Sequence, residues 1–356
     1  MTEEYILSGS NNKWGKNRLE EIAVSVLCMT FNHGQYIKRA LDSFIAQKTD
    51  FLFEIIVHDD ASADYTTEIL KEYELKYQTL IKVIFQKENQ YSKGINIIRE
   101  KLLPSARGKY IAFCEGDDYW SDEYKLQKQY NYMEENPGCS ICLHNTVRHD
   151  INGEKRDSLF HSWKRLHILD DKEIFFGWKV HTSSYFMRKE FTNIRKEIAG
   201  YWFGDYVYLT WAANFGSAAA LPDIMSVYNC NVPAGVTSAK NNLEINSRIK
   251  RNRERAEYLA LYNDLTGGKY ESVIYRRIRE IEFYSDALKD IVTIKNTRNP
   301  LRALDSARKI RRMPSYKTFY ETLNLKKKLI TSFKFGGYAA YPLWKSLWKR
   351  RFSGGV

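Results

Sequence analysis

The sequence predicts an α/β fold, in which a mostly parallel sheet is flanked by helices and followed by a helical C-terminal extension. Short apolar runs rich in β-branched residues alternate four times with helical segments. Such alternation is typical of a parallel sheet with helical crossovers. A cluster of polar residues follows each apolar run, which is where this kind of fold places its functional groups.

The four apolar runs predict strands, and apolar residues at helical spacing predict the helices between them. The helix after the first run has its apolar face from Ile37 to Ile45, and the next helix from Ile69 to Tyr77. Residues 95–106 predict a third helix, with Pro104 near its end. The runs lie at 22–28, 53–60, 81–85 and 109–114, and the polar clusters after them are MTFNHG, HDDASAD, KENQYSKG and EGDDYW.

Beyond residue 120 the alternation weakens. The segment SDEYKLQKQYNYMEENPG predicts a helix that begins near Ser121 and ends before Pro137. Residues 201–214 predict another helix, and strands are predicted at SICLHN, SSYFMR (183–188) and IMSVYNC. From about residue 240 onward the pattern is long, basic and helical. The chain is therefore expected to form three regions: 20–125, 126–238 and 239–356.

The charge of the chain is distributed unevenly. Its 356 residues have a net charge of +12. Residues 241–356 contain 26 Lys and Arg against 11 Asp and Glu, whereas residues 1–240 contain 29 against 32. Because the body is nearly neutral and the C-terminal region is basic, that region is a candidate contact for an anionic surface.

The cysteines and the N-terminal segment predict a cytoplasmic protein. The five cysteines are odd in number and lie mostly in apolar runs, which is typical of reduced, buried thiols. The N-terminal segment has no apolar signal core, and no run of 18 apolar residues occurs. We therefore expect neither secretion by a standard signal nor a membrane-spanning helix.

An acidic motif, CEGDDYW, follows the fourth apolar run. It places Glu115, Asp117 and Asp118 at the end of a buried strand, where like charges repel one another. Carboxylate oxygens bind hard divalent cations such as Mg²⁺ or Mn²⁺, and such a cation stabilises a departing diphosphate. The alternative is a solvated acidic turn. The apolar strand before the motif, and Tyr119 and Trp120 after it, favour the metal site.

Residues 22–130 resemble a family 2 glycosyltransferase of the GT-A fold, in the subgroup with an E-G-D-D-Y-W motif. Four motifs occur in the family's order: VSVLCMTFNHGQYIKRALDSFIAQ, EIIVHDDASADYTTEIL, KENQYSKGINI and GKYIAFCEGDDYWSDEYKLQKQ. A weaker similarity continues to about residue 238 through HTSSYFMRKEF, GDYVYL and MSVYNCNVPAGVTS. The resemblance implies a Rossmann-like sheet, with 20–125 as its nucleotide-sugar-binding half and 126–238 as its acceptor-binding half.

The resemblance also implies an activity and its donor contacts. The activity is inverting, metal-dependent transfer of a hexosyl or deoxyhexosyl group from a UDP- or dTDP-sugar to a glycan or lipid-linked acceptor, in surface polysaccharide synthesis. Asp59 or Asp60 would accept from the N3–H of the base, although Asp60 could instead cap the next turn. The positions that match donor contacts are Thr30, Phe31, Asn32, Asp59, Asp60, Asn89, Lys93 and Asp117.

The same resemblance implies the metal ligands. Asp117 and Asp118 match the family's metal-binding acids, and Glu115 matches the first acidic position of that motif. The family usually has a His after the strand SVY, but Asn231 stands where that His is expected. Asn231 is then either a weaker oxygen ligand, or the Mn²⁺ or Mg²⁺ ion has fewer protein ligands.

The acceptor half contains the implied general base. Inverting transfer needs a base that takes a proton from the acceptor hydroxyl, and Asp205 of FGDYVYL matches the family's base. Family members often have an acidic pair here, whereas this chain has Gly204 before Asp205. The alternative role for Asp205, a helix N-cap, is compatible with catalysis. Trp120 and His181 are candidate acceptor contacts, with a structural role as the alternative for His181.

The basic tail, residues 291–356, predicts peripheral contact with anionic lipid on the inner face of the membrane. It contains 16 Lys and Arg against 2 acids, and FKFGGYAAYPLWKSLWKRRF interleaves aromatic residues with cations. Trp344 and Trp348 are one helical turn apart, as in interfacial anchors. The alternative is a helical extension that packs its aromatic residues on the catalytic domain.

Three rival functions account for less of the sequence. A nucleic-acid-binding protein could use the basic tail, but it leaves the four strand-end motifs unexplained. A nucleotidyltransferase needs a glycine-rich phosphate loop after the first strand, and MTFNHGQY has none. A catalytically inactive relative that binds nucleotide-sugar or glycan is the third, if Asn231 marks the loss of the metal.

Overall fold

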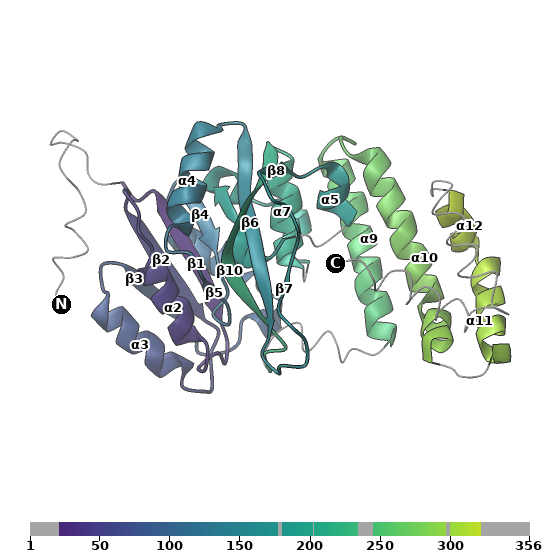
Figure 1. Cartoon of the computed structure of the whole chain (residues 1–356), viewed down its shortest axis with the longest axis horizontal. Coiled ribbons are helices and arrows are strands. Elements are labelled where there is room, and N and C mark those ends of the chain that lie inside the picture. Colours follow the sequence, from purple (N-terminus) through teal and green to yellow (C-terminus); the bar gives the residue numbers. More distant parts are fainter. Residues whose placement is uncertain (1–20, 177–179, 202, 234–244, 297–299, 322–356) are drawn as a thin grey trace. The chain divides into compact units, whose positions relative to one another are not determined.

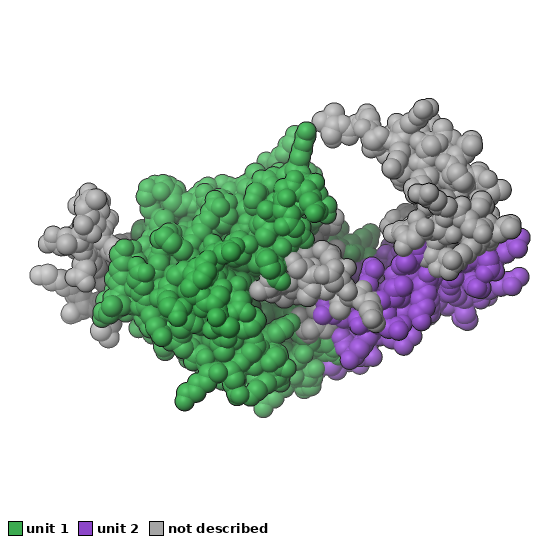
Figure 2. Space-filling view, turned by 90° about the horizontal axis from the view of Figure 1, so that it is seen from below, with its two compact units in different colours: residues 1–242 green, residues 243–356 purple. Residues whose placement is uncertain are grey.

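The computed structural model describes residues 21–176, 180–201, 203–233, 245–296 and 300–321. The chain divides into two compact units, residues 1–242 and 243–356 (Figure 2). The first unit is an α/β domain, and the described part of the second unit is helical. The predicted division of the first unit into two halves near residue 125 stays a prediction.

The first unit is built on a ten-stranded sheet (Figure 1). Its strand order is β3-β2-β1-β4-β9-β6-β10-β5, with β7 paired to β6 and β8 paired to β10. The strands are β1 (Val24–Thr30), β2 (Phe53–Asp59), β3 (Ile81–Phe85), β4 (Tyr110–Phe113), β5 (Tyr119–Trp120), β6 (Cys139–Asp150), β7 (Ser158–Leu159), β8 (His167–Ile168), β9 (Phe186–Arg188) and β10 (Ser217–Cys230).

The longer strand pairings of the sheet are parallel, which confirms the predicted fold class. Strand β1 is parallel to both β2 and β4, and β3 is parallel to β2. Farther along, β10 is parallel to β6. The short strand β9 lies antiparallel between β4 and β6 and so joins the two parallel parts.

Helices α2 (Ile37–Ile45), α3 (Thr66–Lys76) and α4 (Lys125–Glu135) lie beside the sheet (Figure 1). They share one buried cluster with it. Val24, Val26 and Cys28 of β1 belong to this cluster, because alternate side chains of a strand point to the same face. Residues that represent these elements in the cluster are Val24, Val26 and Cys28 of β1, Phe44 of α2, Leu70 of α3 and Leu126 of α4.

Several shorter elements complete the first unit. Helix α7 (Gly204–Ala213) places Tyr208 against Phe113 of β4, with ring centroids 5.6 Å apart. The remaining elements are η1 (Tyr91–Lys93), η2 (Ile98–Leu102), η3 (Leu103–Ser105), α5 (Asp171–Phe176), η4 (Thr182–Ser184), η5 (Lys189–Thr192) and α6 (Lys196–Ala199).

Two predicted elements differ from the structure. In place of an α-helix over 95–106, η2 is a π-helical turn and η3 is a 3₁₀ turn. Pro104 lies at the start of η3, where its ring and missing N–H are incompatible with a continuing α-helix. The strand predicted at 183–188 begins only at Phe186, because η4 forms a turn in which the N–H of Ser184 donates to the carbonyl of His181 at 2.9 Å.

The second unit comprises α9 (Ile245–Leu265), α10 (Glu271–Asn296), α11 (Pro300–Arg312) and α12 (Pro314–Glu321). Helices α10 to α12 share a buried apolar cluster in which Phe283 stacks on Phe319, with ring centroids 4.6 Å apart. Among the described residues, no helix is long and apolar enough to cross a membrane. Trp344 and Trp348, on which the membrane prediction depends, lie outside the described residues.

Candidate metal and nucleotide site

The polar clusters after β1, β2 and β4 meet at one edge of the sheet. The strands are parallel, so their carboxyl ends lie together. Backbone hydrogen bonds join the loops. The N–H of Asp60 donates to the carbonyl of Thr30 at 3.0 Å, and the N–H of Gly116 donates to the carbonyl of Met29 at 2.9 Å. The acidic motif is therefore fixed beside the loop that follows β1.

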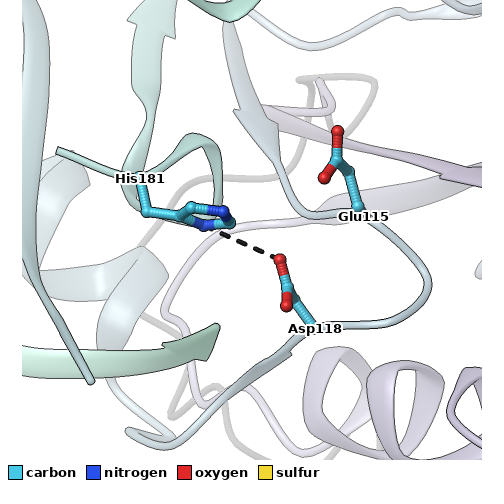
Figure 3. Close-up of side chains that lie close together, drawn as sticks. All are labelled: Glu115, Asp118 and His181. Atoms are coloured by element: carbon cyan, nitrogen blue, oxygen red, sulfur yellow. Dashed lines mark ion pairs between the residues drawn. The ribbon is translucent and has the colours of Figure 1, made fainter. Parts of the chain in front are cut away.

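Three side chains form a compact cluster at this edge: Glu115, Asp118 and His181 (Figure 3). Each offers one ligand atom, and these atoms lie within 4.8 Å of one another. Asp118 and His181 are buried, with 1% and 2% of their surfaces exposed, and Glu115 is half-buried. His181 directly precedes η4, so a residue 63 positions beyond Asp118 completes the cluster.

Asp118 is held by a residue that the sequence analysis did not single out. Its Oδ1 atom accepts from the backbone N–H of Asn229 at 2.9 Å, and the side-chain amide of Asn229 donates to the carbonyl of Asp117 at 2.5 Å. The Oδ2 atom lies 3.6 Å from Nδ1 of His181. Among the described residues this buried oxygen has no hydrogen-bond partner.

The surroundings of Asp118 disfavour the ionised form of its carboxyl group. Burial raises the pKa of Asp118 well above the usual carboxyl value, and the charges of Asp117 and Glu115 raise it further. The hydrogen bond from Asn229 acts in the opposite direction. A buried carboxylate with nearby acids and an unpartnered oxygen is an environment that a cation would stabilise.

The distance between Asp118 and His181 is compatible with one shared divalent cation. Two ligand atoms that each lie about 2.1 Å from one Mg²⁺ ion are about 3 Å apart at a right angle and about 4.2 Å apart on opposite sides. The 3.6 Å between Oδ2 of Asp118 and Nδ1 of His181 falls inside that interval. The donor set of two carboxylates and one imidazole suits Mn²⁺ as well as Mg²⁺.

Asp117 lies against His33 of the loop after β1. Nε2 of His33 is 3.7 Å from Oδ2 of Asp117, and both side chains are largely buried. Within the described part of the chain, Oδ1 of Asp117 and Nδ1 of His33 have no hydrogen-bond partner. The motif FNHG contained this histidine, but nothing in its spacing indicated the contact.

Asn231 lies beside a different acid. Its side-chain amide donates to Oδ1 of Asp150 at 2.8 Å, and its backbone has a positive φ of 68°. His181, which the sequence predicted as an acceptor contact, instead lies with Glu115 and Asp118. The imidazole of this cluster thus comes from the residue directly before η4, and not from the position after the strand SVY.

The predicted base-binding acids are both engaged by protein donors. Asp59 accepts from the N–H and hydroxyl of Ser62 and from the hydroxyl of Thr67. Asp60 accepts from the backbone N–H of Gln90 at 2.7 Å and from that of Tyr91 at 3.0 Å. A carboxylate has about four acceptor positions, so each of these acids retains capacity for another donor.

The other predicted donor contacts surround these acids or lie on the loop after β3. Asn32, at φ 54°, accepts from the N–H of Ala63 at 2.8 Å and links the first two loops. Thr30 is buried, with an unpartnered hydroxyl among the described residues, whereas Phe31 is half-buried. Asn89 accepts from the N–H of Ser92 at 2.7 Å, and Lys93 is exposed and pairs with Glu88.

Asp205 lies in the first turn of α7 and is half-buried. Burial raises the pKa of the Tyr185 phenol well above its usual value, and the charge of Asp205 raises it further. Tyr185 follows η4 directly and His181 precedes it. One short turn therefore separates Tyr185, whose pKa is affected by the charge of Asp205, from His181 of the acidic cluster.

Trp120 differs from its prediction as an acceptor contact. It is 4% exposed and belongs to the buried cluster beneath α2, with its ring centroid 4.6 Å from that of Phe44. Its indole N–H donates to the carbonyl of Ser183 at 3.1 Å. Because the aromatic surface and the N–H are both used inside the core, Trp120 is a support for η4.

Comparison with known proteins gives matches to one family and to curated sequences. Residues 25–195 match the family described as glycosyl transferase family 2. An uncharacterized protein of Mycobacterium tuberculosis is 35% identical over 210 residues, which are 58% of this chain and 58% of that protein. A provisionally named teichuronic acid biosynthesis glycosyltransferase of Bacillus subtilis is 38% identical over 112 residues, which are 32% of this chain and 42% of that protein. This chain thus spans only about half the length of these relatives.

The fold is shared with a solved structure. S. aureus TarS in complex with UDP-GlcNAc superposes with a TM-score of 0.58 and 18% identity, over 90% of this chain and 92% of that chain. At this level of identity the likeness concerns the fold alone, which is the GT-A fold.

Proposed function

We propose that this protein is a family 2 glycosyltransferase that transfers a sugar, with inversion, from a nucleoside diphosphate sugar to a glycan or lipid-linked acceptor. The observation that supports this most directly is the cluster of Glu115, Asp118 and His181, because it lies at the carboxyl edge of the sheet and within the segment that matches the family. The carboxyl edge is where α/β folds bind nucleotides. The GT-A fold agrees with this role.

We place the donor between the loops after β1, β2 and β3. Asp60 would accept from the N3–H of a uracil or thymine base, since its oxygens have acceptor capacity beyond the two loop amides. Thr30, Phe31, Asn32 and Asp59 would surround the base and ribose, and Asn89 and Lys93 would lie near the ribose and diphosphate. The solved TarS complex contains UDP-GlcNAc, which supports a uridine nucleotide.

Glu115, Asp118 and His181 would hold Mn²⁺ or Mg²⁺, with Asp117 adjacent. When bound, such an ion supplies positive charge that stabilises the diphosphate leaving group. The chain's own contribution is to hold Asp118 rigidly, through Asn229, and to keep water away from its buried oxygen.

Asp205 would take the proton from the attacking hydroxyl of the acceptor. The first turn of a helix fixes a side chain while leaving it accessible from one side, and Asp205 is only half-buried there. The B. subtilis relative is named for teichuronic acid biosynthesis, which supports an acceptor in surface polysaccharide synthesis. We further propose a cytoplasmic protein that contacts the inner membrane face through residues 291–356.

The proposal is tested first by donor binding. Thermal unfolding is measured with UDP, UDP-sugars and dTDP-sugars, each with Mn²⁺ and with EDTA, because a ligand that binds only the folded state raises the melting temperature. We expect a metal-dependent rise with at least one of these compounds. Release of UDP or dTDP in the presence of glycan acceptors then tests transfer. If no nucleotide raises the melting temperature under either condition, the proposed function is wrong.

A further inference from the structure

Arg148 of β6 has a guanidinium group that no acid or other acceptor engages within the described part of the chain. The residue is exposed, and its guanidinium carbon lies over the ring of Phe160, 3.8 Å from the ring centroid. The sequence analysis did not single out Arg148, and the proposed reaction makes no use of it.

Arg148 lies beside two aromatic residues that contact the cation cluster. It is opposite Tyr228 in the parallel pairing of β6 with β10. The ring of Tyr228 stacks on that of His181, with centroids 4.1 Å apart and planes inclined by 24°. The ring of Phe160 has its centroid 5.5 Å from that of His181. Two contacts in series, through Phe160, therefore lead from the guanidinium to the cation cluster.

The acids that are close to Arg148 in sequence have other partners. Asp150 accepts from two backbone N–H groups and from the side-chain amide of Asn231. Oδ1 of Asp157 lies 2.9 Å from Nδ1 of His149. Since neither carboxylate pairs with Arg148, the positive charge of this residue is directed to solvent and not to an ion pair.

The arrangement suits the binding of an anionic group from solvent. A guanidinium group is planar and presents its N–H donors around its edge, in a geometry that matches a carboxylate or phosphate with two parallel hydrogen bonds. Attraction to an aromatic ring holds the face of the guanidinium. Phe160 therefore covers a face of Arg148, and the donors at the edge stay accessible.

Arg148 lies on the side of the sheet away from the proposed donor. The donor is placed at the loops after β1, β2 and β3, whereas β6 is separated from β1 by β4 and β9 in the strand order. An anion that binds Arg148 would thus approach the cation cluster from the side opposite to the nucleotide. In a transfer reaction that side belongs to the acceptor.

We propose that Arg148 binds a carboxylate or phosphate group of the acceptor, and that the acceptor is therefore an anionic glycan. This inference rests on the proposed function and adds the chemical class of the acceptor to it. Removing the guanidinium should weaken binding of an anionic acceptor, while binding of the nucleotide and of neutral sugars is retained.

The test measures binding of soluble oligosaccharides to the full chain by isothermal titration calorimetry, with UDP and Mn²⁺ present. Low salt is used, because salt screens exposed charges. The probes are a hyaluronan tetrasaccharide, which contains glucuronate carboxylates, its carboxyl-reduced form, and a glycerol phosphate tetramer. We expect wild type to bind at least one anionic probe, and Arg148→Gln to bind that probe about tenfold more weakly. The probe that is affected shows whether the group is a carboxylate or a phosphate.

Lys109→Gln is the matched control. Lys109 is exposed and lies over the ring of Tyr110, 5.2 Å from its centroid, so the variant also removes a positive charge beside an aromatic ring. Lys109 directly precedes β4, at the amino end of that strand, whereas the cation cluster follows its carboxyl end. We expect this control to bind the anionic probes like wild type.

The outcomes separate this inference from the proposed function. Binding of UDP with Mn²⁺ to wild type tests the proposed donor site by itself. When that binding is present, the acceptor inference alone is wrong if neither anionic probe binds, or if Arg148→Gln binds them as tightly as wild type. A loss of UDP affinity in Arg148→Gln would also overturn it, because the guanidinium would then contact the donor.

Thermal unfolding checks that each variant is folded. Arg148 is exposed, so we expect its replacement to leave the fold intact. Should Arg148→Gln fail to fold, Arg148→Lys decides, because it keeps the charge but loses the planar arrangement of donors. Unchanged binding of both anionic probes in Arg148→Lys would then overturn the proposal.

Discussion

Asp118 and Asn229 meet across 111 positions of sequence, where the backbone N–H of Asn229 donates to Oδ1 of Asp118 at 2.9 Å. This single bond fixes the carboxylate and leaves Oδ2 on the side of His181. The carboxylate is buried, and its pKa is raised by that burial and by Asp117 and Glu115. Its ionised form is therefore unfavourable until a cation is present.

Asp118→Asn should change binding and stability in opposite directions. We expect the difference in UDP affinity between Mn²⁺ and EDTA to disappear, because a ligand oxygen and its charge are lost. Measured in EDTA at neutral pH, the melting temperature should rise, since the ionised carboxylate no longer has to be buried beside two acids. Asp122→Asn is the control: that acid pairs with Lys128, so metal-dependent binding should persist. An unchanged metal effect in Asp118→Asn would refute the assignment.

Asp205→Asn tests the general base. Asp205 lies inside the first turn of α7 and is not its N-cap, which is Phe203. The substitution retains the size of the side chain but removes its basicity. Loss of a general base typically costs about 10²- to 10⁴-fold in rate, so we expect transfer at least about a hundredfold slower, with UDP and Mn²⁺ binding unchanged. Asp170→Asn is the matched control, because Asp170 caps α5 through the N–H of Glu173 at 2.8 Å. Near-normal turnover in Asp205→Asn would mean that another group is the base.

Asp60→Ala should loosen the loop after β3. Asp60 accepts from the backbone N–H groups of Gln90 and Tyr91, and each hydrogen bond to a charged group contributes about 1.5 to 3 kcal/mol. We expect faster amide hydrogen exchange at these two residues and UDP affinity about tenfold weaker or worse, which corresponds to about 1.4 kcal/mol. If exchange accelerates but UDP affinity is unchanged, Asp60 holds the loop without contacting the base.

Lys125 should make the free energy of unfolding depend on pH. Burial lowers its pKa to about 7, against about 10.4 in an unfolded chain. Between these values the unfolded state binds more protons, so this residue makes the free energy of unfolding rise with pH by up to about 1.4 kcal/mol per unit. In urea unfolding, the stability of Lys125→Met relative to wild type should therefore fall from pH 7 to pH 10.

The control for this prediction is Lys128→Met, one turn later in α4. Lys128 pairs with Asp122 and Asp223, and its pKa is raised rather than lowered. Its relative stability should show no such fall between pH 7 and pH 10. A flat difference for Lys125→Met as well would mean that Lys125 stays protonated in the fold.

The basic tail should drive binding to anionic lipid. Replacing Trp344 and Trp348 together with Ala removes the apolar part of the proposed anchor while the net charge is kept. We expect sedimentation with phosphatidylserine-containing vesicles at low salt to fall sharply, while transfer to a soluble acceptor is retained. If the wild-type chain does not sediment with these vesicles at low salt, the tail has another role.

The sequence by itself determined the alternation of strands and helices and the positions of the acidic motif. These features depend on local patterns: apolar runs of strand length, helical spacing from Ile37 to Ile45, and a cluster of acids directly after an apolar run, which indicates the end of a strand. The π-helical and 3₁₀ turns at 98–105 could not be predicted in this way. Apolar spacing there fits several kinds of helix, and Pro104 indicates only where a regular α-helix ends.

Only the tertiary structure decided which side chains meet. Asp118, His181 and Asn229 are brought together by the antiparallel insertion of β9 and by the pairing of β10 with β5 and β6, which no local pattern specifies. The same packing buried Trp120 and turned Asn231 toward Asp150. Strand order and register are set by burial summed over the whole sheet, so contacts between distant residues cannot be deduced from their neighbours in sequence.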